Sequence, residues 1–236
     1  MLKIRNRKIK IFGDGIKIEN LKKINNKLID GITYNPTLFR KLRINNYLNG
    51  CKKIIKFFPN KPISLEVISD NSNSMIEQAL KIQSLADNVY VKIPITFTNG
   101  KSVKAVLRYL VNEGVNINLT AVFTITQIKN IINIIEDTDT IISVFAGRLF
   151  DIGINAEEEM KKINSFIHKN SNCKSLWASP RSSYDVYRAI NSNTDIITIS
   201  EDLINKFKLF DKKPEKYSLE TVNMFYNDAK KSKFKI

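Results

Sequence analysis

The sequence has few of the residues that build metal and redox sites. Among its 236 residues are one histidine and two cysteines, and Cys51 and Cys173 lack the paired spacing of a zinc or dithiol motif. Isolated thiols are typical of a reducing compartment. His168 stands late in a helical segment, and we assign it no role. We therefore expect inert thiols, a cytoplasmic protein, and neither a metal ion nor a cofactor.

Long apolar runs and glycine-rich turns are also missing. No run approaches the length of a membrane span, and the basic start MLKIRNRKIK is not followed by the apolar stretch and small-residue cleavage site of a signal peptide. No glycine-rich phosphate turn of the dinucleotide kind follows any strand-like run. These absences argue against a membrane partner and against a dinucleotide-binding fold.

Positive charge is abundant, at a formal net charge of +15. Such an excess can indicate nucleic acid, because clustered cations release counterions from phosphates. Here the lysines are scattered along the whole chain together with isoleucine and asparagine, which indicates a general compositional bias. We therefore expect no nucleic-acid partner. Anionic small substrates such as sugar phosphates fit the charge equally well.

About eight short β-branched runs alternate with segments of helical period. The runs are 8–13, 31–35, 62–69, 89–95, 115–123, 140–147, 174–180 and 195–200. The helical segments are 20–29, 74–86, 102–114, 126–135, 156–169 and 183–192. This alternation predicts an α/β fold, a (β/α)₈ TIM barrel, with a doubly wound open sheet as the alternative. We expect one domain over 1–236, with a short helix in 201–207 and an additional C-terminal helix at about 217–231, whose start Ser218 marks.

One of these runs, NVYVKIPIT at 88–96, contains a lysine among β-branched residues. The run is typical of a strand that is buried on both faces. Burial disfavours an ammonium ion and can lower its pKa, which makes Lys92 a candidate amine for attack on a carbonyl carbon. The alternative is a lysine at a strand end that extends its amine to solvent.

Further polar residues stand near the ends of the other predicted strands. In a barrel the reactive groups lie at the C-terminal ends of the strands. The candidates there, in addition to Lys92, are Asp14, Thr33, Asn35, Glu66, Asn118, Thr120, Ser143, Arg148, Ser179 and Arg181. An amine, two carboxylates, amides, hydroxyls and two guanidinium groups at one end predict a sugar-phosphate site.

Six motifs in register carry a resemblance: GITYNPT, SLEVIS, NVYVKIPIT, NINLTAVFT, SVFAGRLFDIG and WASPRSS. From Asp14 to about Ser200 the chain resembles the transaldolase family, which contains small transaldolases and fructose-6-phosphate aldolases of the Schiff-base type. The positions that match the family's patterns are Thr33, Asn35, Pro36, the VKIP core at 91–94, Phe145, Gly147, Arg148, Ala178, Ser179 and Arg181. The resemblance implies an α/β barrel that often assembles into pentamers or decamers, so we expect a homo-oligomer.

The resemblance also implies a role for each catalytic candidate. Lys92 would form an iminium with a ketose phosphate, and Asp14 would act as general base on the hydroxyl beyond the bond that breaks. Glu66 would carry protons to and from the water used in imine chemistry, and Thr120 would position that water. Substrate hydroxyls and phosphate would be bound by Thr33, Asn35, Asn118, Ser143, Phe145, Arg148, Ser179 and Arg181.

Two positions separate the members of this chemistry. Transaldolases usually carry glutamate and phenylalanine where fructose-6-phosphate aldolases have glutamine and tyrosine, and the chain has Glu66 and Phe145. This favours a transaldolase of the pentose phosphate pathway over an aldolase. A non-catalytic protein that binds sugar phosphate or nucleic acid is a further alternative.

The departures from the family pattern lie close to these positions: Tyr34, Gly15, Trp177 and Pro180. A large ring at the mouth of the barrel would either point away from it or narrow it, and alternation alone leaves both open. Asp14 has an alternative reading as a turn residue between two glycines. Arg148 and Arg181 have an alternative reading as partners in surface ion pairs.

Overall fold

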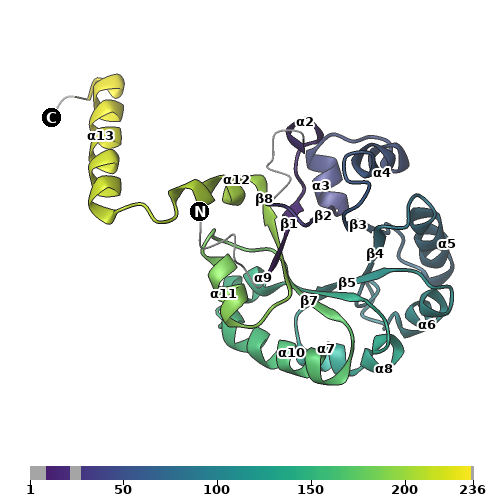
Figure 1. The fold of residues 1–236 in the computed structure, drawn as a ribbon. Helices are drawn as coiled ribbons and strands as arrows, with labels where there is room; N and C mark the ends of the chain where they lie inside the picture. The colour runs from purple at the N-terminus through teal and green to yellow at the C-terminus, as the bar shows by residue number, and fades with distance from the viewer. Residues whose placement is uncertain (1–8, 22–27, 235–236) are drawn as a thin grey trace.

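The computed structural model describes residues 9–21 and 28–234, and its centre is a closed barrel of parallel strands (Figure 1). The strands are β1 (Lys10–Asp14), β2 (Gly31–Thr33), β3 (Ile63–Glu66), β4 (Val89–Pro94), β5 (Ile117–Val122), β6 (Ile141–Val144), β7 (Lys174–Trp177) and β8 (Ile196–Ser200). They pair in sequence order, and β8 closes the barrel against β1. The predicted (β/α)₈ barrel is confirmed, and the open sheet is excluded.

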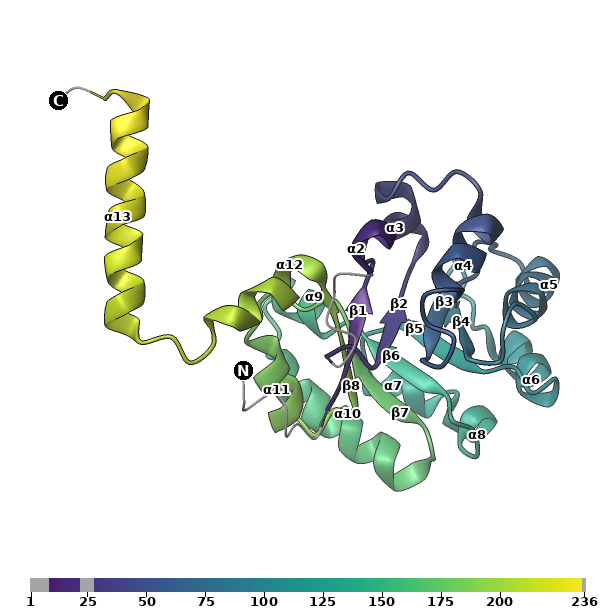
Figure 2. The same cartoon turned by 45° about the horizontal axis from the view of Figure 1, so that its top comes forward.

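Helices surround the barrel, as the two views in Figures 1 and 2 show. They are α2 (Ile18–Leu21), α3 (Pro36–Lys41), α4 (Tyr47–Ile55), α5 (Ser72–Gln83), α6 (Lys104–Asn112), α7 (Ile125–Lys129), α8 (Ile132–Ile135), α9 (Ala146–Asp151), α10 (Ala156–Asn170), α11 (Asp185–Asn191), α12 (Glu201–Asn205), the 3₁₀ helix η1 (Lys206–Leu209) and α13 (Pro214–Ser232). Helices predicted near α5, α6, α10, α11 and α12 are confirmed. Most of the segment predicted at 20–29 lies outside the described residues.

Three features of the helical layer differ from the prediction, and the first is α9, which was not predicted and whose residues 146 and 147 fall within the strand-like run 140–147. The segment 126–135 forms two short helices, α7 and α8, where one was expected. The pair α3 and α4 was not predicted. Each of these two helices begins at an asparagine cap, since Asn35 accepts a hydrogen bond from the Leu38 amide and Asn46 accepts one from the Asn49 amide. Asn35 and Asn46 therefore mark the starts of these two helices.

Apolar side chains form two separate cores. The larger one lies between the strands and the helices and contains residues such as Ile32, Leu65 and Val91. The smaller one fills the interior of the barrel with Phe12, Ile141, Leu176, Ala178 and Ile196. Because side chains alternate along a strand, the residues that follow on the same inner faces are polar, among them Asp14 and Ser143. The barrel therefore has an apolar floor and a polar mouth.

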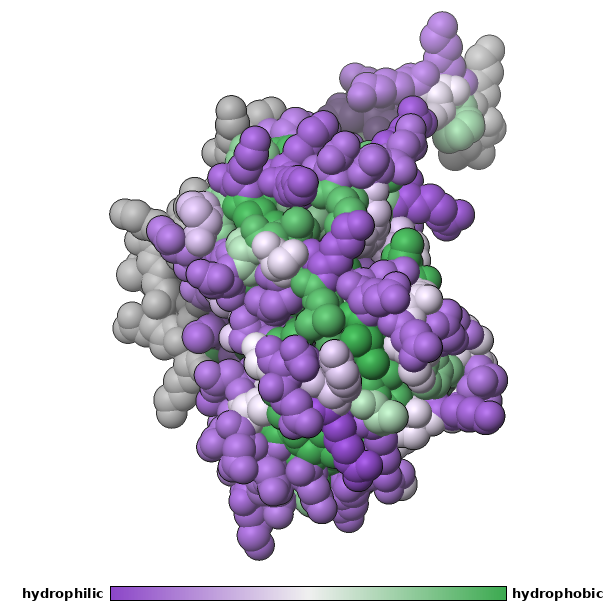
Figure 3. Space-filling model, turned by 90° about the vertical axis from the view of Figure 1, so that its right-hand side faces the viewer, coloured by the Kyte–Doolittle hydropathy of each residue, from purple (hydrophilic) through white to green (hydrophobic). Residues whose placement is uncertain are grey.

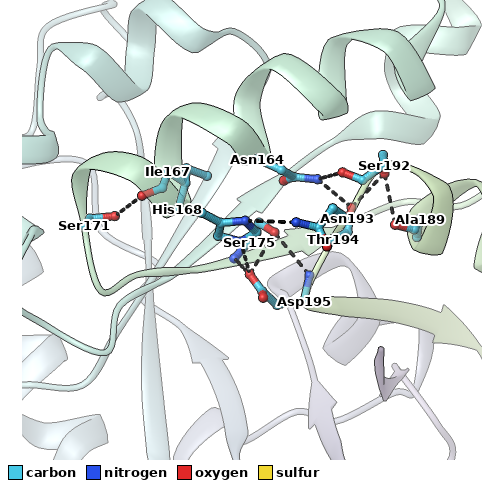
Figure 4. A network of polar contacts seen from close by, with 10 residues as sticks. All are labelled: Asn164, Ile167, His168, Ser171, Ser175, Ala189, Ser192, Asn193, Thr194 and Asp195. Atoms are coloured by element: carbon cyan, nitrogen blue, oxygen red, sulfur yellow. Dashed lines mark hydrogen bonds and ion pairs between the residues drawn. The ribbon is translucent and has the colours of Figure 1, made fainter. Parts of the chain in front are cut away.

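The opposite end of the barrel is fixed by a polar network around Asp195 (Figure 4). Its carboxylate accepts hydrogen bonds from the Ser175 amide at 2.8 Å and from the Ser175 hydroxyl at 3.0 Å. His168 Nε2 lies 2.8 Å from the same carboxylate. These residues join α10 to the N-terminal ends of β7 and β8, where barrels are stabilised and do not carry their chemistry. The single histidine, His168, is thus part of a network that stabilises the fold.

The C-terminal helix α13 extends away from the barrel (Figures 1 and 2), and none of its side chains is buried. It is longer than the predicted 217–231. It begins at Pro214, because proline suits the first turn of a helix, and Ser218 lies inside it. Across the described part of the chain, no helix combines the length and the apolar character that crossing a membrane requires.

Candidate active site

A polar cavity of about 80 Å³ lies at the C-terminal ends of the strands. Most of the residues predicted from the sequence line it: Asp14, Thr33, Asn35, Lys92, Thr120, Ser143, Phe145, Arg148 and Ser179. Ala178 and Thr198 complete the lining. Residues far apart in the chain therefore meet where a barrel places its reactive groups.

Lys92 is buried at the wall of this cavity and forms an ion pair with Glu66. The two residues stand opposite each other on β4 and β3, so their side chains share the inner face of the barrel. Lys92 Nζ lies 2.9 Å from Glu66 Oε2, and the two side chains are 6% and 19% exposed. A buried cation needs such a partner. The alternative of an amine extended into solvent is excluded by this geometry.

Thr120 supplies a hydroxyl that has no partner. Its Oγ1 is buried without a hydrogen bond, although Thr120 lines the cavity. The following residue, Ala121, has a positive φ of 58°, and the pairing of β5 with β6 shifts between Leu119 and Val122. Bulges of this kind redirect side chains near active sites. The free hydroxyl is therefore available to a water molecule or a substrate atom.

Asn118 was predicted to bind substrate, but it does not line the cavity. It is fully buried, its Nδ2 donates to the Ser64 hydroxyl at 2.9 Å, and its Oδ1 accepts from the Ser143 hydroxyl at 2.7 Å. Ser143 does line the cavity. In this arrangement Asn118 orients Ser143, and direct binding of substrate by Asn118 stays a prediction.

Asp14 forms the second acidic group of the site, at the end of β1. Its Oδ1 accepts a hydrogen bond from the Thr33 hydroxyl at 2.8 Å, and that hydroxyl also contacts the Thr198 hydroxyl. Burial raises the pKa of Asp14, and the opposing effects of the Lys92 charge and the Thr33 hydrogen bond do not cancel that rise. A raised pKa makes the carboxylate a stronger base, which suits the role of a group that takes and returns a proton.

The turn after Asp14 explains why a glycine stands at position 15, where the chain departs from the family pattern. Its φ is +60°, a region that glycine adopts without strain, and a Cβ atom there would lie 2.5 Å from the Leu38 side chain. The Gly15 amide donates to the Thr33 carbonyl at 2.9 Å. The glycine therefore fixes the backbone next to Asp14, and the reading of Asp14 as only a turn residue is incomplete.

Arg148 and Ser179 are brought together by the close approach of the first turn of α9 to the loop that follows β7. A Cβ atom at Gly147 would lie only 1.5 Å from the Ser179 carbonyl oxygen, so only glycine fits. Ser179 itself has a positive φ of 60°. The Arg148 guanidinium lies 5.3 Å from the centre of the Phe145 ring, a cation–π distance. One cation is thus placed beside a serine at the mouth.

Arg181 does not line this cavity. Its guanidinium forms a two-pronged ion pair with the Asp151 carboxylate at the surface, with Nε 2.9 Å from Oδ1. Its backbone amide donates to the carboxylate of Asp185 at 2.6 Å. The alternative reading of Arg181 as a partner in a surface ion pair is therefore confirmed. Binding of phosphate by Arg181 stays a prediction.

The large side chains that could have narrowed the mouth point away from it. Tyr34 and Trp177 are fully buried between the barrel and the helices. Tyr34 donates a hydrogen bond to the Ile16 carbonyl at 2.6 Å, and Trp177 packs 6.2 Å from the ring of Phe150. Pro180 does not line the cavity either. None of these three residues lines the cavity, so none of them narrows it.

Two residues near the site were missed from the sequence. Thr198 stands among isoleucines on β8, so its alternation with Ile197 and Ile199 would have placed a hydroxyl inside the barrel. Asp185 is fully buried, pairs with Arg188 at 2.7 Å, and accepts from the Ser182 amide. No pattern in the sequence distinguishes Asp185 from an ordinary first-turn acid of a helix.

Comparison with known proteins agrees with this geometry. Residues 11–236 match the family model described as Transaldolase/Fructose-6-phosphate aldolase. The chain is 36% identical over 230 residues to a "Probable transaldolase" of Thermoplasma volcanium, which covers 94% of the chain and 96% of that protein. It is 32% identical over 198 residues to a "Probable transaldolase" of Bartonella henselae, which covers 83% and 87%.

Solved structures support the fold alone, because their sequences are distant. Thiamine phosphate pyrophosphorylase from Pyrococcus furiosus has a TM-score of 0.51 at 10% identity, covering 84% of this chain and 87% of its own. A prophage protein of the dihydrodipicolinic acid synthase family from E. coli K12 has a TM-score of 0.52 at 13% identity, covering 86% and 75%. The family model over residues 11–236 and the two relatives at 36% and 32% identity show that the chain belongs to the transaldolase/fructose-6-phosphate aldolase family.

Proposed function

We propose that this enzyme is a transaldolase that transfers a dihydroxyacetone unit from a ketose phosphate to an aldose phosphate through a Schiff base on Lys92. The observation that carries the proposal is the ion pair between the buried Lys92 and the half-buried Glu66 at the C-terminal ends of β4 and β3, with Lys92 Nζ 2.9 Å from Glu66 Oε2. The donors we propose are sedoheptulose 7-phosphate and fructose 6-phosphate. The acceptors are glyceraldehyde 3-phosphate and erythrose 4-phosphate, as in the pentose phosphate pathway.

The first stage joins the amine to the ketone. Glu66 takes a proton from Lys92, and the neutral amine attacks the keto carbon to give a carbinolamine. Glu66 then returns a proton to the carbinolamine hydroxyl, which leaves as water, and the iminium forms. The free Thr120 hydroxyl is suited to hold that water, because Thr120 Oγ1 is buried at the cavity without a partner.

The second stage breaks and remakes a carbon–carbon bond. Asp14 removes the proton of the hydroxyl beyond the bond, the bond electrons move to the iminium nitrogen, and an aldose phosphate leaves. A dihydroxyacetone enamine remains on Lys92. It attacks the aldehyde carbon of the acceptor, Asp14 gives its proton to the new hydroxyl, and hydrolysis of the imine frees Lys92.

The phosphate group of each substrate is proposed to bind near Arg148 and Ser179. Both line the cavity, and arginine matches phosphate oxygens in pairs. Arg181 is 45% exposed on the neighbouring loop and would have to leave Asp151 to join them. Asn35 has its Oδ1 engaged by the Leu38 amide, which leaves its Nδ2 for a substrate hydroxyl.

Transfer is proposed over simple release because Phe145 carries no phenol that could protonate the bound fragment. A fructose-6-phosphate aldolase is the second candidate. The test is turnover of fructose 6-phosphate with and without erythrose 4-phosphate. A transaldolase requires the acceptor, whereas steady release of dihydroxyacetone without any acceptor would favour the aldolase. Failure of both reactions would favour a non-catalytic sugar-phosphate-binding protein.

A homo-oligomer is proposed because α13 has an apolar face that no described residue of the chain buries. Leu219, Val222, Phe225 and Tyr226 lie on neighbouring positions of the helix and are 59–63% exposed. On the far side of the barrel, at the right of Figure 1, a groove between α4 and α5 is lined by Leu48, Ile68 and Ile82. That face carries a band of hydrophobic residues (Figure 3). Two different surfaces suit head-to-tail contacts, which close into rings such as a pentamer.

The assembly is tested by light scattering after gel filtration. The double variant Val222→Asp/Tyr226→Asp should give a smaller species than the native chain, and Asn227→Asp on another face of α13 is the control. A native chain that runs as a monomer would contradict the proposal.

A cytoplasmic location is proposed from the free, buried thiols of Cys51 and Cys173.

A further inference from the structure

Three aromatic rings, Tyr34, Phe39 and Tyr47, form a continuous row outside the barrel, which we name the aromatic bridge. The rings of Tyr34 and Phe39 meet edge to face at 5.6 Å, and those of Phe39 and Tyr47 lie 4.4 Å apart with a 30° tilt. The three residues come from the end of β2, from α3 and from α4. Such contacts stabilise a fixed ring geometry.

Each end of the aromatic bridge is a phenol that bonds to backbone beside a catalytic candidate. The Tyr34 hydroxyl donates to the Ile16 carbonyl at 2.6 Å, two residues after Asp14. The Tyr47 hydroxyl donates to the Glu66 carbonyl and accepts from the Glu66 amide at 3.1 Å. The bridge therefore connects the backbone near Asp14 with the backbone of Glu66.

The sheet itself is weak at this position. β2 separates β1 from β3 and has only three residues, Gly31–Thr33. Its register with β3 includes two residue pairs, whereas β3 and β4 share four. Since each ladder pair contributes to fixing the strands, the aromatic bridge adds a second connection between the ends of β1 and β3 where the pairing is short.

Both phenols keep their protons under working conditions. Burial, reinforced by the nearby charge of Asp14, raises the pKa of Tyr34 well above its ordinary value. Burial raises the pKa of Tyr47 likewise, with the Glu66 charge as a smaller cause. Each hydroxyl is therefore a constant hydrogen-bond donor and does not exchange protons with the substrate.

We propose that Tyr34 and Tyr47 are positioning residues, and that the aromatic bridge sets the placement of the Asp14 and Glu66 carboxylates relative to Lys92. The inference rests on the roles proposed above for Asp14 and Glu66. A small misplacement of a catalytic group can lower a rate strongly even when the group remains present. If the rings only filled space, their hydroxyls would be dispensable for the reaction.

The test uses Tyr34→Phe, Tyr47→Phe and Phe39→Leu in the full chain, with Tyr109→Phe on the exposed side of α6 as the matched control. Each protein is mixed with fructose 6-phosphate and borohydride, and the Lys92 adduct is followed by mass spectrometry. Loss of the Tyr47 hydroxyl should slow appearance of any adduct about tenfold, with KM little changed, because Glu66 serves imine formation. Loss of the Tyr34 hydroxyl should leave that rate unchanged.

The Tyr34→Phe variant should instead change which adduct is trapped. Because Asp14 serves bond cleavage, the six-carbon ketose should accumulate on Lys92 in place of the three-carbon fragment. Phe39→Leu should show both defects, although both hydroxyls remain. A purely structural role would lower the melting temperature without changing the ratio of the two adducts.

Two outcomes overturn the inference, and they differ. If the native chain traps an adduct and the bridge variants match Tyr109→Phe in rate and adduct ratio, the aromatic bridge has no positioning role while the proposed function stands. If the native chain traps no adduct, the proposed function fails and the inference fails with it.

Discussion

Lys92 Nζ and Glu66 Oε2 lie 2.9 Å apart across two paired strands, inside a barrel whose floor is apolar. A charge as buried as that of Lys92 needs a partner, because a lone charge in such a place loses its hydration without compensation. The pairing also puts a proton acceptor next to the amine that has to lose a proton before it can attack. One contact therefore serves both the folded state and the chemistry.

Replacing Thr120 by valine should separate stability from activity. Valine has the same shape, so the variant removes only a buried hydroxyl that has no partner. We expect the free energy of unfolding to rise by about 1 kcal/mol, because an unsatisfied buried polar group is costly. The kcat value should fall, since the water of imine formation loses its ligand. Urea unfolding and a transfer assay on the same preparation measure both; a destabilised variant with native kcat would contradict the assignment.

Asp14 should make stability depend on pH in a defined direction. Its pKa is raised above the ordinary value of 3.8 by burial. Its stabilising effect is therefore complete below that value and is lost as the pH rises through the folded-state pKa. Asp14→Asn should then be more stable than the native chain at neutral pH, with the difference vanishing in acid. Urea unfolding at a series of pH values measures this.

Asp70 provides the control for that series. Hydrogen bonds from Thr98 lower the pKa of Asp70, so its contribution is present above the ordinary carboxyl range and is lost as the pH falls. Asp70→Asn should therefore change stability in the opposite direction. Equal and pH-independent effects of the two substitutions would show that burial does not raise the pKa of Asp14.

Gly147→Ala should displace the helix α9, which carries Arg148. The new Cβ atom would meet the Ser179 carbonyl oxygen at 1.5 Å, and backbone cannot yield as a flexible side chain does. We expect a loss of about 3 kcal/mol or more in the free energy of unfolding, together with loss of activity. The matched control is Gly100→Ala, which has a φ of +79° but nothing within 4 Å of its Cβ position. That control should cost about 1 kcal/mol; similar losses for both would exclude the close contact.

Arg148→Ala and Arg181→Ala should differ in their effect on substrate binding. Arg148 lines the cavity, whereas the Arg181 guanidinium is held by Asp151 outside it. Loss of a charged hydrogen bond to phosphate corresponds to about a tenfold or larger rise in KM, which we expect for Arg148→Ala. The effect of Arg181→Ala should be smaller. KM values for fructose 6-phosphate decide this, and a larger effect at Arg181 would mean that it leaves Asp151 when substrate binds.

The sequence predicted the barrel because most of its strands are short runs rich in β-branched residues. The run 195–200 has β-branched residues on both faces, and the run 89–95 has them at every second position; both patterns are typical of strands buried in a parallel sheet. The helices α3 and α4 escaped prediction because Asn45 and Asn46 interrupt the segment between them and look like a loop. Asparagine has the same signature as a turn residue and as a helix cap, so composition alone cannot separate these uses.

The sequence could predict those site residues whose place depends only on their own strand. Lys92, Thr120 and Ser143 follow from strand ends, and family resemblance adds their roles. Contacts between distant segments could not be predicted. Arg181 is held by Asp151, thirty residues earlier in the chain, and no local pattern indicates that pair. Tyr34 was ambiguous in isolation, although its neighbour Thr33 points inward and thus places Tyr34 outside the barrel.

The most direct test of the account is covalent trapping at Lys92. The native chain is incubated with fructose 6-phosphate, reduced with borohydride, digested and analysed by mass spectrometry, beside Lys92→Met as the control. We predict a reduced dihydroxyacetone adduct on the peptide that contains Lys92, and none in the variant. An unmodified Lys92 in the native chain, or equal labelling of another lysine in both proteins, would contradict the Schiff-base mechanism.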